Sequence, residues 1–122
     1  MGSYNSDSHN IQRVAMADGS VRNEGNVEVP VQPYEIAYRS ITPKREQAEN
    51  LLVPVCLSAT HAAYSSVRME PQYMIIGQAA GVAAALAVRA HSAVQDVSIP
   101  ELQKKLHEHG AVLHLREEFK TK

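Results

Sequence analysis

One long apolar run dominates the pattern of this chain. From Tyr73 to Val88 only Gln78 is clearly polar, and the apolar residues do not alternate with polar ones. A run of this length without alternation predicts a helix, which we place at about residues 70–91. Pro71 suits its first turn, where the missing N–H costs nothing. Because a helix that is apolar on all sides must be covered on all sides, we expect it to be buried in a larger core.

Two glycines lie inside this predicted helix. Gly77 and Gly81 each weaken a helix by about 1 kcal/mol relative to alanine, so they indicate a spatial reason. Four positions apart, they share a face with almost no side-chain bulk, which a backbone or a flat ligand can approach closely. The apolar run is shorter than the roughly 20 residues of a membrane-spanning helix, and charged residues flank it. We therefore expect no membrane span.

A second helix is predicted at about residues 99–109. Ser98 is a suitable N-cap, and Glu101 stands three residues after it. Gly110 is a suitable C-terminal stop. An apolar stripe follows the helical repeat at Ile99, Leu102 and Leu106.

The remaining apolar segments are short and predict strands. Residues 36–41 and 51–56 are the clearest strand patterns, and residues 111–115 give a shorter one. Residues 27–31 alternate between valine and other residues, but the proline among them confines such a strand to a sheet edge. Residues 57–71 are expected to form a polar loop before the long helix.

Turn signals divide the N-terminal part of the chain. Asp18-Gly19 predicts a turn. The segment before it, Arg13–Met16, is a short strand or the end of a helix, and Ser20–Arg22 after it is expected to be extended. Together these patterns predict an α+β fold, with short strands around one long buried Ala/Gly-rich helix.

Composition and charge narrow the class of protein. The chain has 122 residues, which is one domain or less, and 44% apolar with 20% charged residues is typical of a globular protein. A net charge of −1 argues against a nucleic acid or a membrane surface as a partner held by charge. The single cysteine, Cys56, excludes an intrachain disulfide, and we expect a buried structural thiol. The cellular compartment is left open.

Three histidines near the C-terminus superficially suggest a metal site. His107 and His109 point to different faces of the predicted helix. Neither they nor His114 have an acidic or cysteine partner at the spacing of a metal site. We therefore expect no metal.

Four motifs follow one another in the middle of the chain. They are Leu51-Leu52-Val53-Pro54, Ser58-Ala59-Thr60-His61, Arg68-Met69-Glu70-Pro71 and Gly77-Gln78-Ala79-Ala80-Gly81. This block resembles the C-terminal part of the FAD-dependent oxidoreductases, flavoproteins of the two-dinucleotide-binding-domain type. Tyr4–Asn10 and Tyr34–Lys44 also resemble that family, and the resemblance covers about residues 4–113.

The resemblance implies a fold and a division of the chain. The fold is then an α+β fragment of an α/β FAD-binding fold. Residues 1–50 correspond to the end of a substrate-domain-like segment and a return connection. Residues 51–115 correspond to the C-terminal part of the FAD-binding domain, and residues 116–122 to a tail. In the family, the loop and the start of the long helix lie beside the flavin.

The resemblance also implies site residues. His61 and His9 are the catalytic candidates, with His9 near the substrate. Arg68, just before the helix, is placed to stabilise negative charge on reduced flavin. The residues themselves leave other roles open. His61 is then a loop histidine bonded to nearby backbone, and Arg68 is paired with Glu70 or solvated. The small residues of the helix then serve only for packing. The cofactor-binding candidates are Ser58, His61, Arg68, Gly77, Gln78 and Ala79.

One part of a dinucleotide-binding fold is missing from this sequence. None of its six glycines belongs to a Gly-x-Gly-x-x-Gly turn, which grips the pyrophosphate in such folds. The chain therefore offers contacts to the isoalloxazine end of FAD without the usual grip on its ADP end. We interpret it as the flavin-side C-terminal segment of an FAD-dependent oxidoreductase, inactive in isolation, in which an organic substrate gives a hydride to FAD.

The partners of the chain and its role as an enzyme segment or a packing module stay open at this point. In the parent protein the expected partners are FAD and a small organic substrate. A homo-oligomer or a complementary FAD-binding chain is also expected, because the long apolar helix needs more protein around it than 122 residues readily provide. The alternative interpretation is a non-catalytic α+β packing or oligomerisation module.

Overall fold

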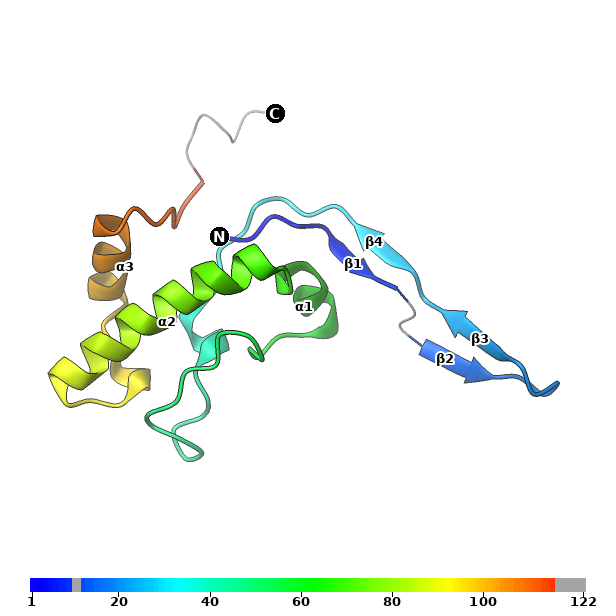
Figure 1. Ribbon diagram of the computed structural model, residues 1–122, viewed down its shortest axis with the longest axis horizontal. Helices are drawn as coiled ribbons and strands as arrows, with labels where there is room; N and C mark the ends of the chain where they lie inside the picture. Colours follow the sequence, from blue (N-terminus) through cyan, green and yellow to red (C-terminus); the bar gives the residue numbers. More distant parts are fainter. Residues whose placement is uncertain (10–11, 116–122) are drawn as a thin grey trace.

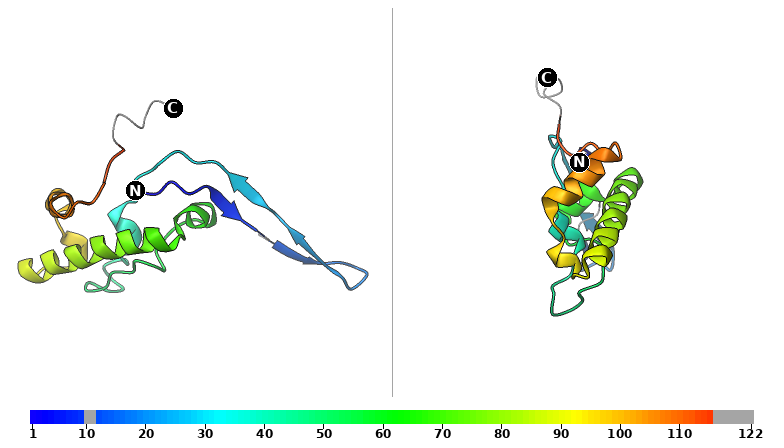
Figure 2. Two further views of the ribbon diagram at one scale, coloured as in Figure 1. Left: turned by 45° about the horizontal axis from the view of Figure 1, so that its top comes forward. Right: turned by 90° about the vertical axis from the view of Figure 1, so that its left-hand side faces the viewer.

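The computed structural model describes residues 1–9 and 12–115. Within these residues, Figure 1 shows a helical body from which a long two-stranded arm projects, and Figure 2 shows the same arrangement from two other sides. The predicted tail, residues 116–122, lies outside the described residues. The elements are the strands β1 (Ser6–Ser8), β2 (Gln12–Ala15), β3 (Val21–Glu24) and β4 (Val27–Val29), the 3₁₀ helices η1 (Tyr38–Ile41) and η2 (Val94–Asp96), and the helices α1 (His61–Val67), α2 (Glu70–Ala90) and α3 (Ile99–Glu108).

The arm consists of two short antiparallel strand pairs, β1 with β4 and β2 with β3. Gly19 turns the chain between β2 and β3 with a φ of 82°, which glycine adopts without steric cost. The predicted turn and the extended segment after it are confirmed, and the alternatives for Arg13–Met16 are settled in favour of a strand, β2. Because an isolated two-stranded hairpin is marginally stable in water, the arm depends on where it docks on the body.

The body contains two small apolar clusters that share α2. One joins the second half of α2 to η2 and α3, and the other joins the first half of α2 to η1 and α1. The first cluster consists of Ala83, Ala87, Val94, Val97, Leu102 and Leu106. The second consists of Ile41, Leu57, Val67, Ile76 and Ala80. Tyr38 and Leu52 pack against both clusters and connect them.

The long helix forms where the sequence predicts it, but only one of its faces is buried. On the other face Met74 is 75% exposed and Val88 is 73% exposed. The described residues therefore cover only one side of α2, and the larger core expected around it is not supplied by them. The buried positions follow the helical repeat at Gln72, Ile76, Ala80, Ala83 and Ala87.

The sequence analysis argued that the long helix is too short to span a membrane, and the length of α2 contradicts that argument. Among the described residues, α2 is the one helix long and apolar enough to cross a membrane by length and composition, since it has 21 residues. It exceeds the apolar run because polar residues extend it at both ends, including Glu70 and Arg89. The core helix of a larger soluble domain meets the same criteria, so this finding does not make α2 a span.

Several predicted strands are absent from the described residues. Residues 36–41 contain η1 instead, and residues 51–56 and 111–115 form no strand. A strand needs a neighbouring strand for its N–H and C=O groups, and residues 51–56 have none here. Residues 57–71, expected as a loop, contain α1, and Cys56 is exposed rather than buried because its segment lies at the surface.

The second helix agrees with the sequence analysis. α3 begins after Ser98, whose hydroxyl accepts the Glu101 N–H, and the chain turns at Gly110 with a φ of 78°. Replacing Ser98 with alanine is expected to lower the free energy of unfolding by about 1 kcal/mol, because the cap bond is lost. Urea unfolding checks this, with Ser98→Asp as the matched control that keeps the cap. Equal losses in both variants would contradict a capping role.

Candidate functional site

A polar pocket of about 310 Å³ lies between β1 and the start of the helical region. We call it the His61 pocket. It brings three residues implied by the family resemblance, His9, His61 and Arg68, into one place. The complete lining consists of Asp7, Ser8, His9, His61, Tyr64, Ser65 and Arg68.

His61 occupies the first position of α1. Thr60 caps this helix, since its hydroxyl accepts the Ala63 N–H at 3.2 Å. The His61 ring meets Ser8 through a hydrogen bond of 2.8 Å between Nε2 and Oγ, although the two residues are 53 positions apart. The bonding partner is therefore a side chain from the arm, not nearby backbone. The second ring nitrogen, Nδ1, has no hydrogen-bond partner within residues 1–9 and 12–115.

Asp7 connects the other two charged residues of the pocket. Arg68 donates from Nη2 to the Asp7 carbonyl oxygen at 3.0 Å, and the same nitrogen lies 3.6 Å from the Asp7 carboxylate. His9 Nε2 lies 2.9 Å from the other carboxylate oxygen, Oδ1. Oδ1 has no hydrogen-bond partner among the described residues, so this contact is an ion pair when His9 is protonated. Arg68 thus pairs with Asp7 and not with Glu70, the partner that the sequence analysis left open.

Buried serines hold the arm against α1 and so assemble the pocket. Ser6 donates to the Ala62 carbonyl oxygen at 2.9 Å and lies 2.8 Å from the Ser65 hydroxyl. Ser66 donates to the Tyr4 carbonyl oxygen and meets the Tyr34 hydroxyl at 2.6 Å. The small hydroxyls of Ser65 and Ser66 thus let the strand approach α1 closely while satisfying buried polar groups. The three buried serines are Ser6, Ser65 and Ser66.

Tyr64 is a pocket residue that the sequence analysis missed. The Tyr73 hydroxyl, from α2, donates to the Tyr64 hydroxyl oxygen at 2.8 Å. Burial, followed by this hydrogen bond, raises the pKa of Tyr73 to about 12. Tyr64 was missed because the helix α1 was not predicted. In a helix over residues 61–67, His61 and Tyr64 are three positions apart and share a face.

The remaining cofactor-binding candidates lie outside the His61 pocket. Ser58 and Gln78 are exposed. At Gly77 an added Cβ would meet nothing within 4 Å, so the small-residue face of α2 opens away from this chain's own core. Ala79 lies on a different face and lines a second cavity. Of the six candidates, only His61 and Arg68 therefore line the His61 pocket.

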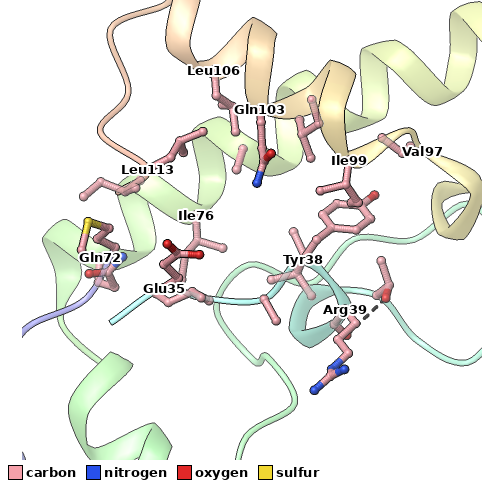
Figure 3. A pocket seen from close by; sticks show the side chains of 18 of the residues that line it. Glu35, Tyr38, Arg39, Gln72, Ile76, Val97, Ile99, Gln103, Leu106 and Leu113 are labelled. Carbon is pink, nitrogen blue, oxygen red and sulfur yellow. Dashed lines mark hydrogen bonds between the residues drawn. The ribbon is translucent and has the colours of Figure 1, made fainter. Parts of the chain in front are cut away.

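The second cavity is an apolar groove of about 720 Å³ between α2, α3 and residues 35–42. Figure 3 shows Ile76, Val97, Ile99, Leu106 and Leu113 around it, with Gln72 at one end. The Gln72 side chain is buried, and its Nε2 has no hydrogen-bond partner within the described residues. The groove therefore exposes part of both apolar clusters and leaves a polar atom unsatisfied.

Metal binding finds no support in the described residues. Residues 1–9 and 12–115 contain no group of three histidine, cysteine, aspartate or glutamate side chains that could hold a metal ion. Of the three C-terminal histidines, His114 pairs with Glu35 through Nδ1 and Oε1 at 2.6 Å.

Comparison with known proteins gives one finding. The sequence profile of a family described as FAD dependent oxidoreductase matches residues 1–106. No curated protein and no solved structure matches the chain. The profile covers most of the 122 residues, including the arm, the His61 pocket and α2. The chain therefore belongs to the FAD-dependent oxidoreductase family.

Proposed function

We propose that this chain forms the flavin-side C-terminal segment of an oxidoreductase in which an organic substrate gives a hydride to FAD. One observation carries the proposal. His9, His61 and Arg68 come from separate family motifs and line one pocket. Burial of apolar surface gives no reason for these three exposed polar side chains to meet there. In this proposal residues 1–50 bring the substrate side of the site and residues 51–115 bring the flavin side.

The residues present fit one end of FAD. Arg68 precedes Met69, the N-cap of α2, so its charge is close to the positive end of the helix dipole. The open face at Gly77 and Gly81 admits a flat ring or a backbone, since an added Cβ would meet nothing there. Ser58, Gln78 and Ala79 are the further candidates for contact with the cofactor. The 122-residue sequence has no Gly-x-Gly-x-x-Gly turn for the pyrophosphate, so these residues fit the isoalloxazine end only.

Bound FAD supplies the two-electron chemistry, and this chain supplies position, charge and a proton acceptor. His61 is the proton acceptor, because Ser8 holds its ring through Nε2 and Nδ1 has no hydrogen-bond partner among the described residues. His9, held by Asp7, orients the substrate at the outer rim of the pocket. Arg68 stabilises negative charge that develops beside it, and Asp7 fixes its guanidinium.

We further propose that the isolated chain is inactive. Without a grip on the ADP moiety, the chain holds FAD no more tightly than it holds riboflavin. The exposed face of α2, with Met74 and Val88, is where the rest of an FAD-binding fold packs in the complete protein. A complementary FAD-binding chain is one source of that fold.

Thermal unfolding with separate parts of the cofactor tests this proposal. Riboflavin and FAD are expected to raise the melting temperature equally, and ADP is expected to leave it unchanged. At a hundredfold excess over the dissociation constant the stabilisation is about 2.7 kcal/mol. Arg68→Gln should weaken flavin binding about two- to fivefold, as expected for a charge near a helix end. The exposed Arg13→Gln on the arm is the matched control. Stabilisation by ADP, or none by riboflavin, would contradict the assignment.

The alternative function is a non-catalytic packing or oligomerisation module. The exposed apolar face of α2 favours it, because such a face is normally covered. Light scattering on the purified chain distinguishes the two. A stable homo-oligomer that does not respond to riboflavin supports the module, whereas a flavin response supports the oxidoreductase segment.

A further inference from the structure

We propose that the His61 pocket takes an organic acid, whose carboxylate is held by Arg68 and His9. This inference rests on the proposed function and names the class of its substrate. It follows from how the charges of the pocket are layered, with a carboxylate beneath and the groups that can carry positive charge at the surface.

Contacts with Asp7 locate the ends of both side chains at the pocket. Arg68 Nη2 lies 3.0 Å from the Asp7 carbonyl oxygen and 3.6 Å from the Asp7 carboxylate. His9 Nε2 lies 2.9 Å from the other oxygen of the same carboxylate. Since Asp7, His9 and Arg68 all line the pocket, the guanidinium and the imidazole are fixed where the three residues meet.

The acidic residue of this group lies below the two others. Within residues 1–9 and 12–115, Asp7 is the only acidic residue that lines the pocket. Its side chain is 16% exposed and its Oδ1 is buried, whereas the side chains of Arg68 and His9 are 40% and 63% exposed. A ligand from solvent therefore meets the guanidinium and the imidazole first. Because charge-assisted bonds to an oxyanion are stronger than neutral ones, this surface favours an anion.

Both side chains keep donors that a carboxylate can use. A guanidinium presents several N–H groups, and within the described part of the chain Arg68 donates one hydrogen bond, to the Asp7 carbonyl oxygen. Protonated His9 donates through both ring nitrogens, and only Nε2 faces Asp7. Asp7 thus holds the two groups in place and leaves their other donors to ligands. Arg68 has enough of them to serve a substrate carboxylate and a neighbouring flavin.

The net charge of the pocket depends on its two histidines. Arg68 and Asp7 balance each other, so the lining is neutral while both histidines are neutral. Each histidine that gains a proton adds one positive charge, and histidine is the side chain whose charge changes between about pH 5 and 8. The other titratable groups around them are Tyr64 in the lining and the exposed Glu28, which pairs with Asp7 in the register of β1 and β4. Anion binding is therefore expected to tighten as the pH falls through this range.

The size of the pocket fits a small acid. Its volume of about 310 Å³ holds roughly ten non-hydrogen atoms, since one water takes about 30 Å³. Benzoate has about this size and is the probe. Benzamide is its matched control, because the two molecules have nearly the same shape and differ in charge. Neither of them requires flavin in order to bind.

NMR titration of the chain with labelled histidine side chains measures both affinities. We expect benzoate to move the signals of His9 and His61, and to bind about fivefold or more tightly than benzamide at pH 6. Arg68→Gln should weaken benzoate binding about fivefold and leave benzamide binding unchanged. Arg89→Gln is the matched control, because it removes the same charge at the other end of α2, about 30 Å away.

The pH dependence provides a second readout. A change from about pH 8 to pH 6 at constant ionic strength should tighten benzoate binding about two- to fivefold for each histidine that gains charge. Benzamide binding should stay the same. His9→Gln should remove part of the gain, whereas His107→Gln should keep it, because His107 is exposed on α3 and lies outside the pocket.

Equal affinities for benzoate and benzamide would overturn the proposal, as would a benzoate affinity that is the same at both pH values. Inorganic phosphate that binds as tightly as benzoate would also overturn it, since the pocket would then select for charge and not for an organic acid. Benzoate binding without a riboflavin response would support the acid site and count against the flavin assignment. A riboflavin response without any preference for benzoate would overturn the acid site and leave the flavin assignment in place.

Discussion

Replacing Leu102 with alanine is expected to lower the free energy of unfolding by about 2–5 kcal/mol. Leu102 is 4% exposed and belongs to the cluster that joins α2 to α3 and η2. Its partners on α2, Ala83 and Ala87, are too small to move into the space that the leucine leaves. The cavity therefore stays open, and its cost adds to the lost transfer energy of the side chain.

Urea unfolding and a melting curve measure this effect. A loss of this size is expected to lower the melting temperature by about 10 °C or more for a domain of this length. Leu51→Ala is the matched control, because Leu51 is the same residue type but is 48% exposed. Its cost should be below about 1 kcal/mol. Similar losses in both variants would mean that the cluster around Leu102 does not hold the body together.

Replacing Ser66 with alanine is expected to release the arm from the body, at a cost of about 1–3 kcal/mol. Ser66 is 5% exposed and bonds two separate segments, through the Tyr4 carbonyl oxygen and the Tyr34 hydroxyl. Without its hydroxyl both groups lose this partner at a partly buried position. Because β1 carries Asp7 and Ser8, release of the arm also dismantles one wall of the His61 pocket.

Hydrogen–deuterium exchange distinguishes this local release from general destabilisation. In Ser66→Ala the amides of β1 and β4 should exchange faster, whereas those of α3 should keep their original rates. The exposed Ser3→Ala is the control, and it should leave both regions unchanged. Equal acceleration in α3 would show that Ser66 supports the whole fold, and no acceleration anywhere would show that other contacts hold the arm.

The helices α2 and α3 were predictable because their signals are local, whereas α1 was not predicted. The apolar run, Pro71 and the cap at Ser98 each act within a few residues, so their effect does not depend on the rest of the protein. The same holds for the turn at Gly19, where the backbone conformation requires glycine. Family membership was also readable from the sequence, since it is carried by the order of short motifs.

The strand predictions failed where a neighbour was needed. Residues 51–56 have the composition of a buried strand, yet a strand is stable only when a second strand pairs with it. Within the described residues no such strand lies beside them, and Val53 bonds only to Ile41. The sequence also did not predict which side of α2 is buried, because apolar residues occur on every face of this helix.

The sequence alone predicted the helices α2 and α3, the family and the candidate residues His9, His61 and Arg68. It could not show that β1 lies against α1, because that contact depends on hydrogen bonds between residues more than 50 positions apart. Only the tertiary structure placed Ser8 on His61 and Tyr73 on Tyr64. Local chemistry thus decides which elements form, whereas the site depends on the docking of distant segments, which no local pattern encodes.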